Sequence, residues 1–411
     1  MSPTAHGPDS RYAVMRLAIA LLVMTVGSSG MYVVSVVLPA VQADFGVARA
    51  DASLPYTLLM IGFGVGGIVM GKLADRHGVM WPLLIGAVGI AIGYVACGLS
   101  GSIGAFAAWH ALFIGLLGSG SAFAPLIADT SLWFVKRRGI AVAVCASGNY
   151  VAGAIWPPVV QHFVETVGWR QTYVGMGVFC GVTMAALALF MRTRPPIDAP
   201  ATMTATRAGA TGALPFGLSI GTAQGLLCIA GAACCVAMAM PQVHIVAYCS
   251  DLGYGAARGA QMLSLMLACG VVSRLVSGAI CDRIGGLRTL VLGSALQGLA
   301  LLLFLPVDGL ASLYVVSALF GLFQGGIVPS YAIIVREHFP ANEAGARVGT
   351  VLMCTLLGMA LGGWMSGKVF DLAGSYHAAF LNGIAWNLVN LTIALTLLSR
   401  TRWTGRPLAA A

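Results

Sequence analysis

Charged residues are scarce in this sequence. Only 9% of the 411 residues are Asp, Glu, Lys or Arg, whereas soluble globular chains average about 25%. Hydrophobic residues make up 59%, and long runs contain no charged residue at all, among them 17–43, 83–128, 208–250 and 372–399. A helix needs about 20 apolar residues to cross a bilayer core. The lack of charge therefore excludes a soluble globular chain and predicts a membrane protein.

The sequence also lacks the patterns that common enzyme chemistry requires. Its ten cysteines lie scattered through apolar segments with no C-x-x-C spacing, which indicates small apolar helix residues rather than metal ligands or disulfides. We find no nucleophile–base arrangement and no phosphate-binding loop, because the glycines of GVGG at 64–67 lie inside an apolar run. We therefore expect a protein that is not an enzyme and that holds no metal and no cofactor.

The apolar runs have room for twelve membrane-spanning helices. The run 83–128 is long enough for two spans, with GLSGSIG at 98–104 as the turn between them. Weaker segments at 259–281, 289–307 and 348–370 complete the set. The predicted fold class is thus an all-α membrane protein with twelve transmembrane helices. The short polar N-terminus leads straight into the first span without a cleavage site, so we expect it to be retained.

The basic charge is distributed unevenly along the chain. If the N-terminus is cytoplasmic, the inside loops and tails, with Arg11 and Arg16 counted among the tail residues, hold 17 of the 22 Lys and Arg residues, and the outside loops hold four. This is the positive-inside pattern, and it predicts that both termini are cytoplasmic. The net charge of +9 therefore reports topology and predicts no nucleic-acid partner.

The two halves of the chain repeat each other. GVGGIVMGKLADRHG at 64–78 aligns with GVVSRLVSGAICDRIG at 270–285 at an offset of 207, and the loop at 165–173 aligns with 371–380 at an offset of 206. We expect two pseudo-symmetric six-helix bundles, 1–191 and 216–411, joined by a cytoplasmic linker at 192–215. Parallel repeats of this kind place a substrate site between the halves, near the membrane midplane.

One cation remains inside a span. Arg274 lies eight residues before Asp282, about 12 Å along a helix, and a charge at the centre of a spanning helix costs about 2.5–3.5 kcal/mol to insert. Its repeat partner is Gly67, and no acidic residue of the sequence lies at comparable depth. An arginine also reaches the interface by snorkelling, and structural pairing is a further alternative. We favour a binding role, because a guanidinium offers a two-donor fork that matches a carboxylate.

Several motifs together resemble a known transporter family. The loop GKLADRHG and its echo after the eighth span resemble the loop motif of the major facilitator superfamily. The stretches FGVARADAS at 45–53, GWRQTY at 168–173 and PQVHIVAYCSDLGY at 241–254 resemble the branch of monocarboxylate transporters and oxalate/formate antiporters. The resemblance implies the major facilitator fold, and it implies that Arg274 binds the substrate carboxylate.

The sequence also departs from that family. Gly270 stands where animal monocarboxylate transporters carry an aspartate, and Ala40 stands where they carry a lysine. The eleventh span lacks the deep lysine of the oxalate/formate antiporter, since Lys368 lies at its outer end. A single deep cation suits a single carboxylate, so we disfavour a dicarboxylate substrate.

Other residues are candidates for binding, coupling and gating. The further candidates for substrate binding are Asn149, Tyr32, Tyr150, Gln324 and Tyr331, each of which also suits helix bridging. His110 and His244 are candidate proton carriers because histidine titrates near neutrality; both also suit a structural hydrogen bond. The resemblance implies a gating loop formed by Gly71, Asp75, Arg76, Asp282 and Arg283; these residues also suit an ordinary solvated loop. The glycine pairs Gly62/Gly66 and Gly67/Gly71 predict close helix contacts.

These observations predict a secondary active transporter of a small monocarboxylate, coupled to protons by symport and working by alternating access in a bacterial-type inner membrane. We expect a monomer whose partners are the substrate, a proton and the lipid bilayer. An exchanger of organic acids is one alternative. An exporter of a larger compound is another, although it usually needs a deep acidic residue. A membrane sensor would be expected to carry an added soluble domain.

Overall fold

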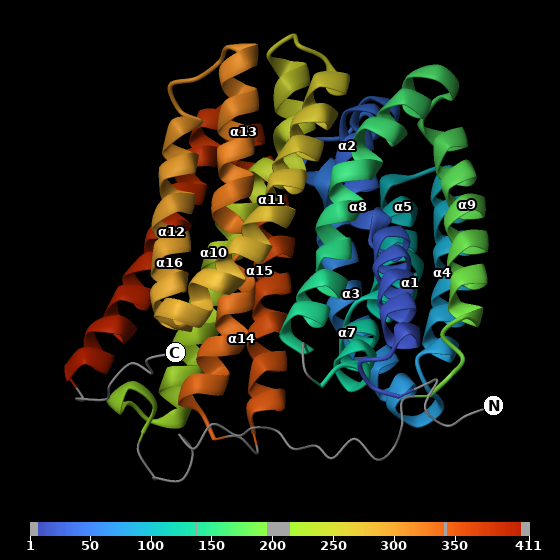
Figure 1. Ribbon diagram of the computed structural model, residues 1–411. Coiled ribbons are helices and arrows are strands. Elements are labelled where there is room, and N and C mark those ends of the chain that lie inside the picture. Colours follow the sequence, from blue (N-terminus) through green and yellow to red (C-terminus); the bar gives the residue numbers. More distant parts are fainter. Residues whose placement is uncertain (1–6, 136–137, 195–213, 341–342, 404–411) are drawn as a thin grey trace. The chain divides into compact units, whose positions relative to one another are not determined.

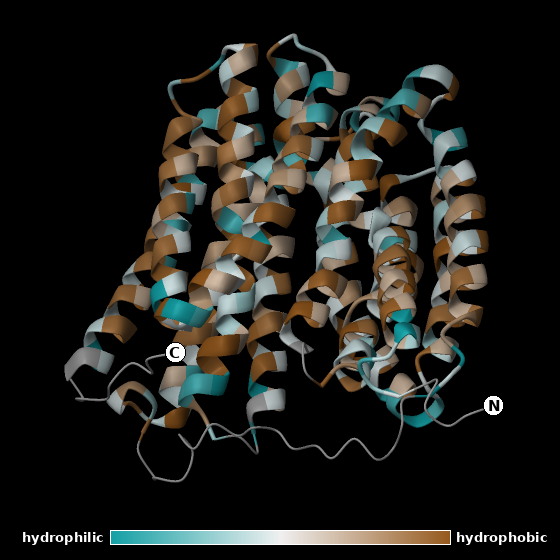
Figure 2. Cartoon of the chain, in the orientation of Figure 1, coloured by the Kyte–Doolittle hydropathy of each residue, from teal (hydrophilic) through white to brown (hydrophobic). Residues whose placement is uncertain are grey.

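The computed structural model describes residues 7–135, 138–194, 214–340 and 343–403, and within these ranges every regular element is a helix (Figure 1). Twelve helical stretches are long and apolar enough to cross a membrane. Hydrophobic residues cover these helices along most of their length (Figure 2). The predicted fold class and the predicted number of spans are confirmed: the chain is an all-α, multi-pass membrane protein.

The first six spans contain ten helical segments. They are α1 (Arg11–Gly27), α2 (Ser29–Phe45), α3 (Arg49–His77), α4 (Met80–Gly98), α5 (Ile103–Trp109), the π-helix η2 (His110–Ser119), α6 (Gly120–Ala122), α7 (Ala124–Trp133), α8 (Arg138–Val167) and α9 (Trp169–Leu189). The segments α1 and α2 together form the first span, and α5 to α7 form the fourth. The predicted turn at 98–104 lies between α4 and α5.

The last six spans contain seven helices. After the short 3-10 turn η4 (Pro215–Gly217) come α10 (Ile220–Asp251), α11 (Ala256–Ile284), α12 (Gly286–Leu303), α13 (Leu310–Gln324), α14 (Ile327–His338), α15 (Ala344–Ala373) and α16 (Tyr376–Trp403). The segments α13 and α14 together form the tenth span. The tenth span is thus interrupted at two consecutive glycines, Gly325 and Gly326.

Contacts between residues group the chain into two compact units. Unit 1 consists of residues 1–201 and 245–268, and unit 2 consists of 202–244 and 269–411. The end of α10 and the start of α11 therefore group with the N-terminal helices. Most of the predicted linker, 195–213, lies outside the described residues, so the domain boundaries at 192–215 stay a prediction.

Particular contacts hold the end of α10 and the start of α11 within unit 1. The buried Arg49 of α3 donates from Nη2 to the carboxylate of Asp251, at 3.1 Å to Oδ1 and 3.2 Å to Oδ2. The Ser264 hydroxyl donates to the Ala154 carbonyl of α8. Leu267 lies so close to Gly153 that a Cβ on this glycine would overlap the leucine side chain.

The backbone repeats itself at the offset found in the sequence. Gly78 and Gly285 lie 207 residues apart and have φ of 84° and 81°. Gly78 follows α3 and Gly285 follows α11, so each glycine lies in the turn between two successive spans. Gly168 and Gly374, at an offset of 206, have φ of 84° and 64°. Positive φ is readily adopted only by glycine, so both repeats preserve the residue that each turn requires.

One of the two predicted glycine pairs mediates close helix packing. A Cβ on Gly62 would overlap the Ala111 carbonyl oxygen, and one on Gly66 would overlap that of Leu116. By contrast, a Cβ on Gly67 would meet only the Ala124 side chain, at an ordinary 3.7 Å. The Gly62/Gly66 stripe therefore lets α3 lie directly against the π-helix η2.

Arg16 is not a tail residue, contrary to the charge count made from the sequence. It lies inside α1 and is only 2% exposed. Its Nε and Nη2 donate to the two carboxylate oxygens of Asp129 at 2.9 and 3.0 Å, and its guanidinium lies 4.9 Å from the Trp133 ring centroid. The buried carboxylate of α7 makes this position possible, because a buried charge needs a hydrogen-bonded partner.

The packing at Gly66 leads to a first prediction. Gly66→Ala will lower the midpoint of thermal unfolding of the purified protein by several degrees, because overpacking costs about 1–3 kcal/mol and the obstacle here is backbone. Gly67→Ala, one residue along the same helix, serves as the matched control and will leave the midpoint within about 1 °C of the wild type. Equal midpoints for the two variants would contradict the close approach of α3 and η2.

Candidate functional site

Arg274 lies well inside the eighth span. It stands 10 residues before Ile284, the last residue of α11, which corresponds to about 15 Å of helix. The side chain is partly buried and its Nε is shielded from solvent. The structure thus places Arg274 inside α11, with its Nε shielded from solvent.

The break between α13 and α14 meets α11 at this level of unit 2. The Gly325 amide donates to the Ser273 hydroxyl at 3.1 Å. A Cβ on Gly325 would lie 2.6 Å from the Gly270 carbonyl oxygen and 2.9 Å from the Arg274 nitrogen. No side chain fits at position 325, so the interrupted helix comes into direct contact with the backbone of Arg274. Broken helices beside a deep polar group are typical of transporter binding sites.

A pair of buried amides lies next to this contact. Gln242 of α10 donates from Nε2 to Oε1 of Gln324, the last residue of α13, at 3.1 Å. Gln324 is 1% exposed, and its own Nε2 has no hydrogen-bond partner among the described residues. An unsatisfied buried amide donor costs about 1–3 kcal/mol. The backbone of Arg274 and the buried amide of Gln324 therefore both adjoin Gly325.

Unit 1 contains a second pair of predicted binding residues. The Tyr32 hydroxyl of α2 donates to Oδ1 of Asn149 on α8 at 2.9 Å. Tyr32 is buried, whereas Asn149 is partly accessible. The structure thus brings together two residues that are 117 positions apart. Tyr150, the neighbour of Asn149, is also buried.

Tyr331 lies in a different polar cluster of unit 2. It is fully buried on α14, and its hydroxyl donates to Oδ1 of Asn390 on α16 at 2.9 Å. Asn390 in turn donates to the Ser294 hydroxyl of α12 at 2.7 Å. These bonds join three helices, which is the helix-bridging role that the sequence left open for this tyrosine.

Both candidate histidines are fully buried and have protein groups at each ring nitrogen. His110 begins η2; its Nδ1 lies 2.9 Å from the Phe106 carbonyl oxygen and its Nε2 lies 3.1 Å from the Tyr173 hydroxyl. His244 of α10 has Nε2 2.8 Å from the Gly363 carbonyl oxygen and Nδ1 3.2 Å from the Tyr376 hydroxyl. Each histidine therefore bridges helices within its own unit.

The predicted gating residues lie at the ends of α3 and α11. The charged side chains of Asp75, Arg76, Asp282 and Arg283 are exposed, and none of them forms an ion pair with another described residue. Gly71 lies six residues before His77, the last residue of α3, and has open space where a Cβ would stand. A latch formed by these residues stays a prediction.

Sequence reasoning missed Gln242 and the Arg49–Asp251 ion pair. A polar residue directly after Pro241 in a long apolar run was the available signal for Gln242. For the ion pair, the signal was an arginine at the start of one span and an aspartate at the end of another. Neither signal identifies a partner, because partners on different helices depend on helix rotation.

Comparisons with known proteins agree with this architecture. A family model described as Major Facilitator Superfamily matches residues 19–362 and 225–409. Monocarboxylate transporter 13 of Rattus norvegicus is 27% identical, with 84% of this chain and 78% of the relative covered. Monocarboxylate transporter 11 of Mus musculus is 26% identical over 93% of this chain and 86% of the relative.

A fungal relative and a solved structure extend the comparison. The agnestins efflux protein AgnL12 of Paecilomyces divaricatus is 22% identical over 80% of this chain and 74% of the relative. The crystal structure of a peptide transporter, POT, in complex with sulfate superposes with a TM-score of 0.75 at 15% identity, covering 99% of this chain and 98% of that one. This structural likeness supports the fold alone. The chain belongs to the Major Facilitator Superfamily of membrane transporters.

Proposed function

We propose that this protein is a secondary active transporter of a small monocarboxylate and that Arg274 anchors the substrate carboxylate. The observation that carries the proposal is the position of Arg274 on α11, ten residues or about 15 Å of helix before the helix end, where its backbone meets the break at Gly325. A charge at this depth is expensive. A planar two-donor fork matches a carboxylate in charge and geometry, and two of the curated relatives are named monocarboxylate transporters.

The other predicted binding residues are further candidates for contact with the substrate, each within its own unit. The free Nε2 of Gln324 supplies an additional donor in unit 2. In unit 1, the Asn149 amide nitrogen can donate to a hydroxyl or carboxylate oxygen, while the Tyr32 hydroxyl, which already donates to Asn149, holds that amide in place. Tyr150 is the neighbouring aromatic. Tyr331 acts at one remove, because its hydroxyl is already bonded to Asn390.

We propose coupling to one proton per substrate. Import of a monoanion against about 100 mV costs about 2.3 kcal/mol, and a co-transported proton removes that electrical cost. Between the two histidines we favour His244. It lies in the same unit as Arg274 and Gln324. His110 bonds only groups of unit 1.

Two alternatives stay open within the transporter class. Exchange of organic acids needs the same carboxylate anchor but no proton. Export of a larger compound is favoured by one observation, the likeness to a fungal efflux protein. We propose that the protein is a monomer in the cell (inner) membrane. The positive-inside distribution supports the placement of both termini in the cytoplasm.

A second prediction concerns the anchor. Arg274→Ala will reduce uptake of labelled monocarboxylates into proteoliposomes by at least 100-fold, because the carboxylate loses its counter-charge. Arg274→Lys will also be impaired, by about 10-fold or more, since a point charge lacks the fork. Arg258→Ala is the matched control, because Arg258 is an exposed residue of the same helix that bonds Gln261. Uptake by Arg274→Ala at the level of this control would rule out the anchor.

A third prediction concerns coupling. An inward proton gradient will accelerate uptake several-fold in wild-type protein, and His244→Gln will lose this acceleration while His110→Gln retains it. If the gradient has no effect and substrate loaded inside accelerates uptake instead, the protein is an exchanger. If both histidine variants keep the gradient response, the proton travels with the substrate and neither histidine carries it.

A fourth prediction concerns alternating access. The Arg49–Asp251 contact holds the end of α10 to α3 within unit 1, whereas the first part of α10 belongs to unit 2. Because α10 is shared by the two units, we propose that this contact opens and closes during transport. Arg49→Cys/Asp251→Cys, linked by a short bifunctional thiol reagent with a reducible spacer, will lose uptake, and reduction of the spacer will restore it. Each single cysteine variant treated with the same reagent is the control. Full uptake by the linked protein would contradict movement at this contact.

A further inference from the structure

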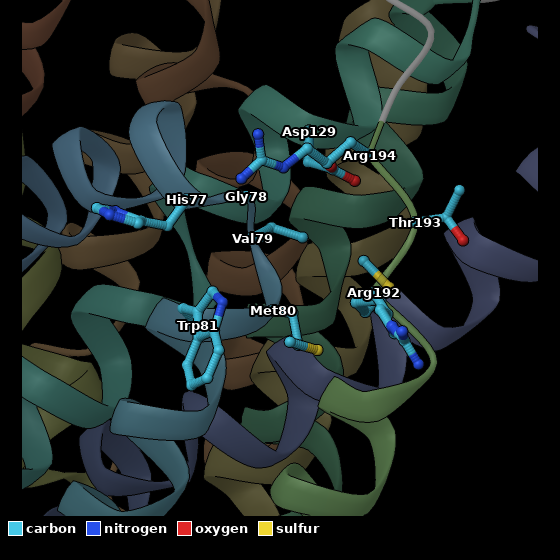
Figure 3. Close-up of a pocket in the computed structure, with 10 residues that line it drawn as sticks. His77, Gly78, Val79, Met80, Trp81, Asp129, Arg192, Thr193 and Arg194 are labelled. Atoms are coloured by element: carbon cyan, nitrogen blue, oxygen red, sulfur yellow. The ribbon is translucent and has the colours of Figure 1, made fainter.

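A cavity in unit 1 takes no part in the proposed transport site. Its volume is about 290 Å³, and it lies where α3 ends, α4 begins and α9 gives way to the following segment (Figure 3). Its walls are the turn residues 77–81, the segment 191–194 and Asp129 of α7. None of the residues proposed to bind the carboxylate lines it.

The cavity is cationic. The exposed side chains of Arg192 and Arg194 contribute two positive charges, and neither arginine forms an ion pair with another described residue. The one carboxylate in the wall, Asp129, is already bonded at both oxygens by Arg16. Arg16 also donates to the Met191 carbonyl at 3.3 Å, so its charge adjoins the wall as well. The wall therefore has an excess of positive charge that calls for an anion.

The start of α4 borders the same space. The helix α4 begins at Met80, and its N-cap residue, Val79, provides no side-chain hydrogen bond. The first amides of a helix lack intrahelical acceptors and attract anions. Val79, Met80 and Trp81 all line the cavity. The Arg194 side chain lies over the turn, with Nε 3.5 Å from where a Cβ on Gly78 would stand. Arginine and the helix start thus converge on one volume.

Exposed apolar side chains continue from the cavity along α4 and α9. Trp81 is 52% exposed, Phe190 and Leu189 are each 61% exposed, and Ile85 follows one turn after Trp81. The two helices pack against each other along their length. Tryptophan at the end of a spanning helix is typical of the headgroup level of a bilayer. A ligand with an anionic head and an apolar tail matches both the cationic cavity and the apolar side chains beside it. Free phosphate would contact only the cationic cavity.

We propose that this cavity binds the phosphodiester of an anionic phospholipid in the leaflet that this end of the spans faces. Arg192 and Arg194 bind the phosphate oxygens, the start of α4 adds backbone N–H donors, and an acyl chain lies along Trp81 and Phe190. Basic pockets between transmembrane helices bind anionic headgroups in this way, and arginine pairs with phosphate through two parallel bonds. The site would make the stability of unit 1 depend on lipid composition.

The test measures thermal unfolding of the detergent-purified, full-length protein during titration with short-chain phosphatidylglycerol. Phosphatidylcholine and inorganic phosphate are titrated in parallel at matched ionic strength. Phosphatidylglycerol will raise the unfolding midpoint of the wild type more than phosphatidylcholine does. Equal effects of the two lipids would overturn the proposal. An equal effect of inorganic phosphate would overturn the lipid assignment and indicate a phosphate site.

A pair of double variants locates the effect. R192Q/R194Q will weaken the apparent affinity for phosphatidylglycerol at least 10-fold while its midpoint without added lipid stays near that of the wild type. R288Q/R336Q removes two arginines of unit 2 and serves as the control, with the affinity unchanged. Equal loss in both double variants, or none in R192Q/R194Q, would overturn this site. If R192Q/R194Q unfolds at a lower temperature than the wild type, native mass spectrometry of R192K/R194K replaces it as the test. Lysine keeps the positive charge, so a bound phosphatidylglycerol adduct is expected, and its absence would overturn the site.

Discussion

The cost of placing charge in a low-dielectric medium governs this protein. Each cation that enters the spans has to be compensated, and the compensation differs by position. Arg16 has a bidentate bond to Asp129 within unit 1, and Arg49 has Asp251. Arg274 lies in unit 2, where its helix meets the break at Gly325 next to the buried pair of Gln242 and Gln324. The account of function rests on that position and on the two-donor fork that a guanidinium offers to a carboxylate.

The internal repeat distinguishes the position of Arg274 from its counterpart in the first half of the chain. Positive-φ glycines recur at the same offset, as at Gly78 and Gly285, so the two halves share their turns. The repeat is unequal at one deep position, where Gly67 stands opposite Arg274 in the alignment. Gly67 is in ordinary contact with Ala124 and has no tight packing role. A duplicated scaffold with one added cation suits a substrate that carries one negative charge.

Much of the fold could be predicted from the sequence, because long apolar runs and glycine turns are local signals. The twelve spans, the turn at 98–104 and the family resemblance are examples. Partners across helices could not be predicted in this way. Arg16 was counted as a tail residue, because nothing in its own segment indicates that Asp129, 113 residues away, lies beside it. The same reason hid the bond from Gln242 to Gln324. When helices are apolar on all sides, the sequence period does not define which face a polar residue occupies, and breaks such as the π-helix η2 rotate the residues that follow.

The central claim is that Arg274 recognises a carboxylate, and equilibrium binding tests it without reference to transport. Purified protein is titrated with a short monocarboxylate and with its uncharged amide, for the wild type and for Arg274→Gln. The account predicts that the wild type binds the acid at least 100-fold more tightly than the amide and that the variant loses this preference. Equal affinity of the wild type for acid and amide, or an undiminished preference in Arg274→Gln, would contradict it.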